Sequence, residues 1–555
     1  MSASSKKKLR KEQNAAQLTQ KQLQEQKEAK KLKHYTVTFV TVMVLIVCLG
    51  IGMIGFTAVN NSGVFERNTK AVKIGDRVLS NAQLNYYFID AIQNTYNDWY
   101  KEYGEYMSVM TLLQNKLSLT APLNQQLHPT DAGRTYADFF VDKAIEEAKR
   151  AYVLNDMAAA ENFALTEEDL SDIDDLISSM TMLSKAYGYN NLNGYLKAMY
   201  GNGANKENYR EYVTVTKLAS KFQTNYQDSL KYTADQLNAY NQEHFNEFSS
   251  FTFRYFYLTA EDFIAHAEDD TSHNHNEEDT AAALKKAEAA ANILASCGAV
   301  NADEFDSAIK ALEGLQGKED TKKATQKKYT LYTAINEDIA KWVAEEGRKA
   351  NDIKMIPYTT KDTDEDGNET TKTNGYFVVM FEKREDNNEF LVDVRHILIK
   401  FEGGTKNETT GETTYSEAEK KTAYDKIVSI KETWQAGDAT EDSFKELAKK
   451  ESKDPGSASS GGLYTEVYPH KMVDSFNDWC FDPARETGDV EIVESEHGYH
   501  LIYFVKTGEV TYRNQMIEKT MRDNDFETWF NALPGKTTHE VLDPSRLSLD
   551  IAMGS

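Results

Sequence analysis

Two stretches, Val394-Arg395-His396-Ile397-Leu398-Ile399-Lys400 and His497-Gly498-Tyr499-His500-Leu501-Ile502-Tyr503, decide the fold of the C-terminal half of this chain. Both have the apolar character of a buried or half-buried β-strand, and each carries histidine among its apolar residues. The sequence between them predicts two helices, a turn-rich loop and a short third helix, at residues 416–435, 441–450, 454–462 and 472–476. This strand–helix–helix–loop–helix–strand order predicts a compact α+β domain.

Four motifs in this segment are similar to the parvulin class of peptidyl-prolyl cis/trans isomerases. They are R-H-I-L-I in the first strand, S-x-D-P-G-S-x-x-x-G-G in the loop, M-V-x-x-F after it and G-Y-H-x-I in the last strand. Each motif alone is a weak signal, but all four occur in the family's order and spacing. The resemblance implies catalysis of rotation about X-Pro bonds. That rotation breaks no bond, so neither a nucleophile nor a cofactor is expected.

The resemblance implies three catalytic residues, His396, Asp454 and His500. In the family the two histidines face each other on neighbouring strands and share a hydrogen-bond network, which fixes the polarity and shape of the pocket floor. Asp454 falls where relatives have cysteine or aspartate, close to the carbonyl that rotates. An aspartate before Pro455 is also a typical turn former, and the two roles are compatible.

Four further residues are expected to bind the substrate. Met472 and Phe476 are four residues apart, so they would lie on one helical face and grip the proline ring, with ordinary core packing as the alternative. Tyr464 replaces an aliphatic pocket residue of many relatives, which puts the substrate preference in doubt. His497 occupies a position where others have a small hydroxyl residue, and it could contact the histidine network.

An earlier segment repeats part of this pattern. Trp342 is followed by an arginine after six residues and an aspartate after ten, and so is Trp479. Residues 251–388 are therefore expected to form a second parvulin-like domain with insertions. It lacks a D-P-G-S loop and has Tyr255 and Phe377 at the two histidine positions. We expect it to keep the fold and to lack the activity.

The N-terminal sequence predicts a membrane anchor. Residues 1–34 carry a net charge of +7, and residues 35–59 contain no charged side chain. About 20 apolar residues span a bilayer, whereas the core of a cleaved signal peptide, the alternative, has about 7–15. A single-pass helix is expected, with the N-terminus in the cytoplasm and the bulk of the chain outside the cell. The expected location is the cell membrane of a Gram-positive bacterium.

The next segment predicts a mostly helical domain. A small hairpin is followed by a helix capped by Ser80, and further helical patterns cover residues 131–163, 167–187 and 206–244. Thr166 and Asp169 are expected to form a capping pair at the start of the second of these patterns. This part resembles the N-terminal chaperone region of extracytoplasmic foldases of the PrsA and SurA type. A helix over residues 511–533 is expected to dock on it.

The expected fold class is therefore a multidomain α+β chain with a transmembrane helix, a helical chaperone module, two parvulin-like domains of which the first is degenerate, and a C-terminal helix. The expected domains, in that order and after a basic cytoplasmic tail, are 1–34, 35–59, 60–250, 251–388, 389–508 and 509–555.

Charge and composition restrict the partners. The net charge of −25 disfavours binding to nucleic acid. The loop from 401 to 415 has Lys406 as its only cation, so a preference for phosphorylated substrates is not expected. Three cysteines give no disulfide framework. Two sets of residues imitate metal sites, the histidines His266, His273 and His275 and the acidic stretch 362–373. A surface insertion and a polar hairpin tip are the favoured interpretations, and no metal is expected.

The sequence predicts a membrane-anchored extracytoplasmic prolyl isomerase and chaperone that assists the folding of secreted proteins. Its partners would be unfolded or nascent secreted polypeptides with X-Pro bonds, and its oligomeric state is left open. The alternative is a catalytically weak holdase whose parvulin domains serve as peptide-binding modules.

Overall fold

The computed structural model describes residues 60–103, 117, 121–129, 131, 133–264, 277–315, 323–363, 369–407, 411–533 and 538–549. The chain divides into two compact units, one of Met1–Asn97, Tyr106–Gln223 and Leu533–Ser555, and one of Asp98–Glu105 and Thr224–Ala532. The basic tail, the expected transmembrane helix at 35–59 and the three histidines of the acidic insertion lie outside the described residues. Among the residues that are described, no helix combines the length and the apolar character needed to cross a bilayer.

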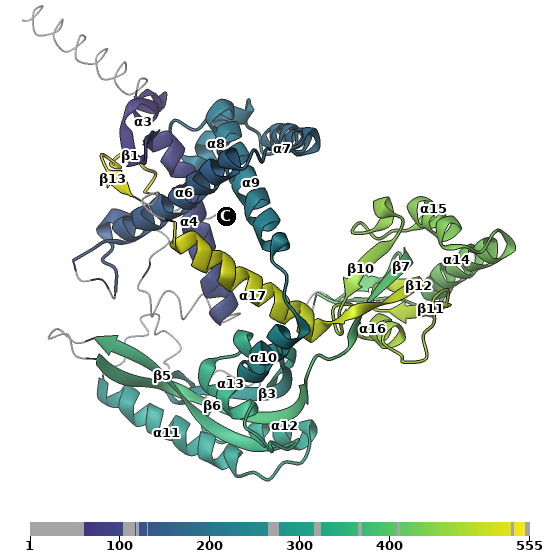
Figure 1. The fold of residues 1–555 in the computed structure, drawn as a ribbon. Helices are drawn as coiled ribbons and strands as arrows, with labels where there is room; N and C mark the ends of the chain where they lie inside the picture. The colour runs from purple at the N-terminus through teal and green to yellow at the C-terminus, as the bar shows by residue number, and fades with distance from the viewer. Residues whose placement is uncertain are drawn as a thin grey trace, which may run out of the picture. The chain divides into compact units, whose positions relative to one another are not determined.

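The first unit combines helices with a small antiparallel sheet (Figure 1). The sheet has the strand order β13-β1-β2, so the strand nearest the C-terminus pairs with the first strand of the unit. Its elements are α3 (Val64–Asn68), β1 (Lys70–Ile74), β2 (Arg77–Ser80), α4 (Asn81–Tyr103), α6 (Tyr136–Ala160), α7 (Glu167–Ala186), α8 (Leu192–Tyr200), α9 (Lys206–Ser229), which continues into the second unit, and β13 (His539–Val541).

Several predictions for this unit are confirmed. The hairpin β1–β2 leads directly into α4, and Ser80 and Gln83 exchange hydrogen bonds as a capping pair. Thr166 and Asp169 form a capping box at the start of α7. Two details of the helical prediction are wrong. The pattern over 206–244 is two helices, because Thr233 forms a new capping box with Gln236 and starts α10 (Ala234–Glu243), which belongs to the second unit. Helix α8 and strand β13 were not expected from the sequence.

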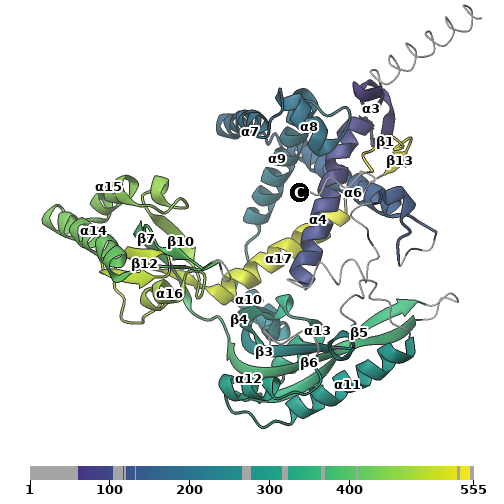
Figure 2. The ribbon, with the colours of Figure 1, turned by 180° about the vertical axis from the view of Figure 1, so that it is seen from behind.

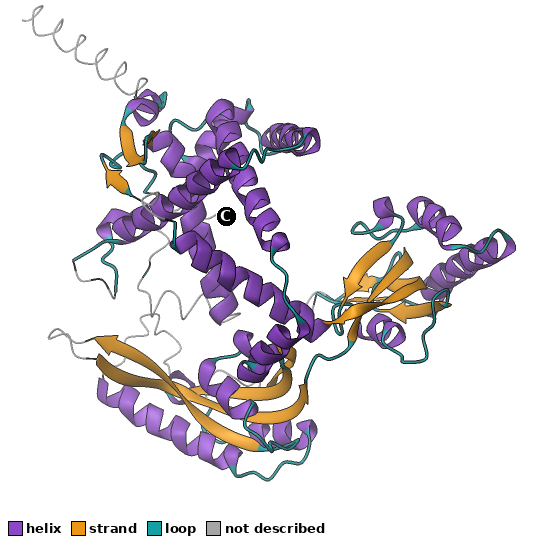
Figure 3. Cartoon of the chain, viewed as in Figure 1, coloured by secondary structure: helices purple, strands orange, loops and turns teal. Residues whose placement is uncertain are grey.

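The second unit contains two four-stranded sheets of the same topology, coloured orange in Figure 3. One has the order β4-β3-β6-β5 and the other β10-β7-β12-β11. The strands are β3 (Ser250–Thr259), β4 (Thr325–Leu331), β5 (Ile353–Thr363), β6 (Glu369–Glu385), β7 (Phe390–Lys400), β10 (Leu463–Val467), β11 (Val490–Ser495) and β12 (Gly498–Thr511). The central strands β7 and β12 were predicted; the two edge strands β10 and β11 were not.

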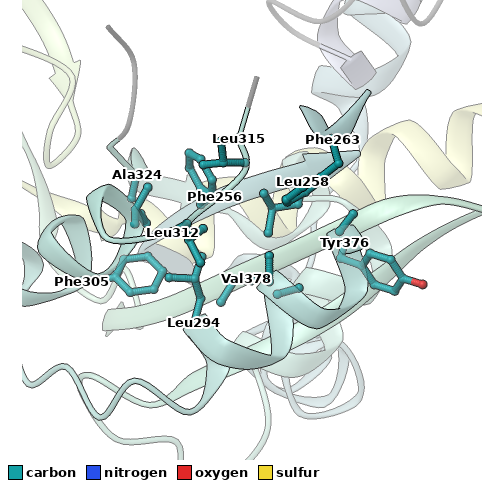
Figure 4. Packing of buried hydrophobic residues seen from close by; sticks show 14 of the residues in the cluster. Phe256, Leu258, Phe263, Leu294, Phe305, Leu312, Leu315, Ala324, Tyr376 and Val378 are labelled. Atoms are coloured by element: carbon teal, nitrogen blue, oxygen red, sulfur yellow. The ribbon is translucent and has the colours of Figure 1, made fainter. Parts of the chain in front are cut away.

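Helices cover both faces of each sheet. In the first sheet domain, α11 (Glu277–Ala295) and α12 (Ala302–Lys310) pack on one face through an apolar core shown in Figure 4, while α13 (Glu337–Val343) packs on the other. In the second, α14 (Glu417–Ala436) and α15 (Glu441–Glu451) take the place of α11 and α12, and α16 (Asp474–Cys480) takes the place of α13. The predicted internal repeat is therefore a repeat of structure.

The repeated Trp–Arg–Asp spacing has a physical explanation. The guanidinium carbon of Arg348 lies 4.1 Å from the centre of a Trp342 ring, and that of Arg485 lies 4.7 Å from a Trp479 ring. Each arginine also forms an ion pair of 3.5 Å with the aspartate four residues later, Asp352 in the first domain. The backbone carbonyl of that aspartate then accepts a hydrogen bond of 2.9 Å from the central strand of its own sheet. The motif thus clamps the connection after α13 or α16 to the sheet.

The acidic stretch at 362–373 joins two paired strands. Strands β5 and β6 run antiparallel in register as far as Thr363 opposite Glu369. The prediction of a polar hairpin is confirmed for these flanking residues; residues 364–368 lie outside the described part. No group of three or more histidine, cysteine, aspartate or glutamate side chains among the described residues could hold a metal ion.

The predicted C-terminal helix is confirmed as α17 (Tyr512–Asn531), capped by Thr511. It packs on the end of α9 and on α10, both within the second unit. Trp529 stacks on Tyr226 with ring centres 4.2 Å apart, and the Asp525 carboxylate accepts a hydrogen bond from the Tyr232 hydroxyl.

Candidate active site

Two buried histidines from neighbouring strands meet in the second sheet domain. His396 on β7 lies opposite Ile502 in the strand register, and His500 on β12 lies opposite Leu398. The two side chains therefore project from the same face of adjacent strands, two positions apart. Their Nδ1 atoms are 3.1 Å apart and their rings are stacked, with centres 5.3 Å apart. Both residues are at least 95% buried.

The D-P-G-S loop brings Asp454 to the outer nitrogen of His396. One oxygen of the carboxylate, Oδ2, lies 3.0 Å from His396 Nε2. The same oxygen accepts hydrogen bonds from the Ser457 hydroxyl at 2.5 Å and the Tyr464 hydroxyl at 2.9 Å. Asp454 is also a turn former, because its carbonyl accepts the N–H of Ala458 at 3.1 Å. Both roles suggested by the sequence are present.

The other end of the histidine pair contacts a serine. The Ser495 hydroxyl lies 2.8 Å from His500 Nε2, and the backbone N–H of His497 donates to it at 3.1 Å. Hydrogen-bond complementarity assigns the tautomers. An ionised Asp454 needs a proton on His396 Nε2, so Nδ1 of His396 accepts from Nδ1–H of His500. Nε2 of His500 then accepts from Ser495, and one continuous chain of donors runs from Ser495 to Asp454.

The surroundings of Asp454 and His500 fix the charge states of these two side chains. The hydrogen bond from His396 lowers the pKa of Asp454 far below its usual range, with further lowering by the hydroxyls of Ser457 and Tyr464 and opposition from burial. Burial, together with the nearby His396 and His497, lowers the pKa of His500 to about 3. At neutral pH the site therefore holds an ionised carboxylate and a neutral His500 imidazole.

The loop that carries Asp454 is tied to strand β7. The N–H of His396 donates to the carbonyl of Gly462 at 2.9 Å. The Arg395 guanidinium donates to the carbonyls of Ser460 and Gly461 and pairs with Glu441 at 2.8 Å. These contacts hold the loop against the strand, so the distance between Asp454 and His396 is set by the fold.

Phe476 forms an apolar wall beside the imidazoles. Its ring stands edge-on to both histidine rings, with centres 5.4 Å apart in each case. Met472 is half-buried in the same apolar cluster. The prediction that Met472 and Phe476 share a helical face is wrong, because α16 begins at Asp474 and Met472 lies in the preceding bend. The two residues reach one cluster through the fold of the connection.

The remaining candidates divide into one that joins the network and one that does not. Tyr464 on β10 contacts both Asp454, by its hydroxyl, and the His396 ring, with centres 5.4 Å apart. The side chain of His497 is 59% exposed and lies near Glu496. The small hydroxyl expected in its place is supplied by Ser495, two residues earlier.

Sequence reasoning missed three residues of the site: Ser457, Ser495 and Arg395. Ser457 belongs to the quoted loop motif, and Arg395 precedes the first histidine, so both stand in the motifs although the sequence assigned them no function. Ser495 had no signal, because it belongs to an edge strand that was not predicted.

The first sheet domain has an aromatic cluster at the equivalent position. Tyr255 lies opposite Val379 and Phe377 opposite Tyr257, which is the register of His396 and His500 in the second domain. The rings of Tyr255 and Phe377 have centres 5.6 Å apart, and Tyr257 stacks on Phe377 at 4.5 Å. These positions therefore hold no imidazole pair.

Comparison with protein families shows the class of this domain. Residues 376–529 match the family described as the PPIC-type PPIase domain. The chain thus contains a parvulin-type peptidyl-prolyl isomerase domain, and the resemblance found in the sequence is confirmed. The match begins in β6 and ends in α17, so it includes every residue of the histidine network.

Solved structures of foldases resemble the chain weakly. PrsA from Bacillus anthracis is 22% identical over 27% of this chain and 57% of that chain, with a TM-score of 0.17. PrsA from Bacillus cereus is 28% identical over 26% and 48%, also with a TM-score of 0.17. PrsA from Bacillus subtilis is 14% identical over 74% and 88%, with a TM-score of 0.25. The chain thus covers little more than half of the first of these relatives. A search of curated proteins gives no match.

Proposed function

We propose that this chain is a membrane-anchored extracytoplasmic peptidyl-prolyl isomerase and chaperone that assists the folding of secreted proteins. The observation that carries the enzymatic part is the hydrogen-bonded row Asp454–His396–His500–Ser495 beside Phe476. The PPIC-type match over the same residues supports it.

Catalysis of X-Pro rotation requires a pocket of suitable shape and polarity, and no bond has to be broken. Rotation of the amide meets a barrier of about 18–20 kcal/mol because of its conjugation. Without a catalyst the exchange takes roughly tens to hundreds of seconds, which can limit folding. A site accelerates it by binding the twisted amide better than either planar form, and each tenfold in rate needs about 1.4 kcal/mol.

Each part of the site has a role in that differential binding. Phe476 and Met472 offer apolar surface for the proline ring. In this proposal the ionised Asp454 acts on the polarity of the rotating amide, and its three hydrogen bonds fix its position. The histidine pair holds Asp454 in place through His396 and does not act as a nucleophile. Tyr464 links β10 to the carboxylate of Asp454 by its hydroxyl.

The choice of substrate follows from charge. The loop from Phe401 to Tyr415 has one lysine, Lys406, among acidic and hydroxyl residues. It offers no cluster of cations for a phosphate, so unmodified X-Pro segments of unfolded or nascent secreted chains are the proposed substrates. The uncharged stretch 35–59 behind a basic tail supports a single-pass anchor in the cell membrane.

A proline-turnover assay on the full-length chain in mild detergent tests the enzyme. His396→Ala, Asp454→Ala and Met472→Ala should each lower kcat/KM at least about tenfold, which corresponds to about 1.4 kcal/mol. Asp425→Asn, on the exposed face of α14, is the matched control and should leave kcat/KM unchanged. Wild-type turnover at the uncatalysed rate would refute the proposal.

The alternative, a holdase that uses its parvulin domains only to bind peptides, makes a different prediction. It requires suppression of aggregation that the three substitutions leave unchanged, together with background isomerase activity in the wild type.

A further inference from the structure

Exposed apolar side chains are concentrated on one short segment of the first unit. Among the described residues, 17 large apolar side chains are exposed, and six of them lie between residues 170 and 189. They are Leu170, Leu176, Met182, Leu183, Tyr187 and Tyr189, and Met182 and Tyr187 are each 68% exposed. A cluster of this kind on a soluble surface marks a site of interaction, whereas isolated exposed apolar residues need no explanation.

The helix that carries most of them is attached to its unit along one narrow row. Helix α7 buries only Ile173, Ile177 and Ser184 on the side that faces the core, apart from its capping residue Asp169. Leu176, Leu183 and Tyr187 follow one another by seven and four residues, so they form a second apolar row along one face of the helix. Figures 1 and 2 show α7 projecting from the unit beside α8.

Aromatic packing extends this surface beyond the end of the helix. The rings of Tyr187 and Tyr195 are stacked with centres 6.1 Å apart, and Tyr189 meets Tyr195 edge-on at 5.4 Å. Tyr195 itself is buried, so it anchors the two exposed tyrosines. Rigid aromatic rings of this kind offer a large contact area to apolar partners.

The charges beside this apolar row select the partner. Six acidic residues lie on α7, against one lysine. Asp169, Asp172 and Asp174 form ion pairs with cations of α9. Within the described residues, no ion pair involves Glu168 or Asp175, both of which are exposed. Helix α7 therefore carries, besides its apolar row, exposed carboxylates that form no close ion pair among the described residues.

We propose that α7 is a docking surface for non-native polypeptide segments that carry both apolar and basic side chains. The proposal rests on the proposed chaperone function and names where and what the helical module binds. Charge excludes the other occupants. Nucleic acid and anionic lipid are repelled by the acidic residues. A second copy of this chain, with a net charge of −25, would bring the same acidic surface against itself.

Peptide binding by the full-length chain in mild detergent tests this inference. The probes are two fluorescent peptides without proline, one with leucine, tyrosine and lysine and one with glutamate in place of each lysine. The absence of proline keeps the measurement independent of the isomerase site. We expect the lysine peptide to bind, and the glutamate peptide to bind at least about tenfold more weakly.

Two variants locate the binding site. Leu176→Ser, Leu183→Ser and Tyr187→Ser combined should weaken binding of the lysine peptide at least about tenfold, with an unchanged helical circular dichroism spectrum. Glu168→Gln with Asp175→Asn should weaken the lysine peptide and leave the glutamate peptide unchanged or slightly tighter. The control is Ile293→Ser with Val300→Ser, which removes similarly exposed apolar area from the first sheet domain and should have no effect.

Three results would overturn the inference. The triple variant could bind the lysine peptide as tightly as the wild type does, or the wild type could bind the two peptides equally tightly. Light scattering could also show a dimer that the triple variant loses while it still binds the peptide. Turnover of a short proline peptide, measured on the same samples, should be normal in every variant. If the wild type itself showed no turnover above the uncatalysed rate, that result would contradict the proposed isomerase activity and leave the docking surface untouched.

Discussion

At the scale of single residues, the site depends on one chain of hydrogen bonds between groups of fixed charge. Asp454 is ionised because three donors surround one of its oxygens. His500 is neutral because it is buried between His396 and the Ser495 hydroxyl. Because His500 stays neutral in the folded chain but takes up a proton more readily in the unfolded chain, the stability of the fold depends on pH.

The pH dependence follows from the lowered pKa of His500. The unfolded chain takes up a proton at this histidine near pH 6.5, whereas the folded chain does so only near pH 3. The unfolded state therefore binds more protons in this interval, and stability falls as the pH is lowered from 6.5 toward 3. Urea midpoints of the wild type and of His500→Gln should show a shallower decline for the variant. Parallel curves would contradict the burial of a neutral His500.

Asp454 also makes the stability of the fold decrease as the pH is lowered, but in a lower pH range than His500. Its pKa is depressed, so the stability it provides is present above the ordinary aspartate pKa, near 3.9, and is lost as the pH falls below that value. In Asp454→Asn the additional loss of stability below about pH 4 should be reduced, as measured by the urea midpoint. Asp425→Asn, an exposed carboxylate, is the control.

At the scale of elements, a glycine allows the catalytic loop to join the sheet. Gly462 has φ of +73°, and a Cβ at this residue would lie 2.2 Å from the carbonyl oxygen of His396. That carbonyl belongs to β7, so any side chain would push β10 and the loop away from the strand. The tight approach explains why the double glycine follows the D-P-G-S motif.

Alanine at Gly462 should therefore disrupt the site. Gly411 has the same φ of +73° with no atom within 4 Å of its Cβ position, so Gly411→Ala pays only the cost of the left-handed backbone, about 1–2 kcal/mol. Gly462→Ala should lower the free energy of unfolding by more than this and reduce turnover along with it. Equal effects of the two substitutions on stability would show that backbone conformation alone matters.

The two sheet domains also differ at this scale. The first has the strand register of the second but holds Tyr255 and Phe377 where the second holds histidines. We expect the full-length variant that combines His396→Ala with His500→Ala to fall to the uncatalysed rate, because the first domain holds Tyr255 and Phe377 in place of an imidazole pair. Residual turnover that is then abolished by Tyr255→Phe would refute this prediction.

At the scale of the whole molecule, the chain is organised by residues that connect distant segments. Arg513 at the start of α17 is 1% exposed and donates to the carbonyls of Phe245, Phe248 and Asp386. It also donates to the side chain of Asn241 at 2.7 Å. This one guanidinium joins α10, the entrance to the first sheet domain, its exit and the C-terminal helix.

Removal of Arg513 should destabilise the second unit strongly. Arg513→Met removes the hydrogen bonds that a buried guanidinium donates to three carbonyls and to Asn241, each with a net contribution of about 1 kcal/mol, so a loss of at least about 3 kcal/mol in the free energy of unfolding is expected. Lys519→Met, on the exposed side of the same helix, is the control and should change stability by less than about 0.5 kcal/mol. Similar urea midpoints for both variants would contradict the connecting role.

Part of the fold and of the site could be predicted because the evidence for it is local. The periodicity of 394–400 and 497–503 predicted the central strands, the capping pair Thr166–Asp169 predicted the start of α7, and the repeated Trp–Arg–Asp spacing predicted two copies of one domain. His396, Asp454 and His500 were found by their place in motifs, and the structure brings these three together.

The rest was decided by tertiary structure. Edge strands β10 and β11 have little periodicity of their own and exist because β7 and β12 offer them hydrogen-bonding partners. Met472 reaches the apolar cluster from a bend, and β13 pairs with a strand more than 450 residues earlier in the chain. The sequence by itself determined which residues are candidates for the site and where the central strands and most of the helices lie, because these depend on near neighbours. The three-dimensional fold alone decided which hydroxyls complete the histidine row and which segments meet, because hydrogen bonds between distant residues leave no periodic trace in the sequence.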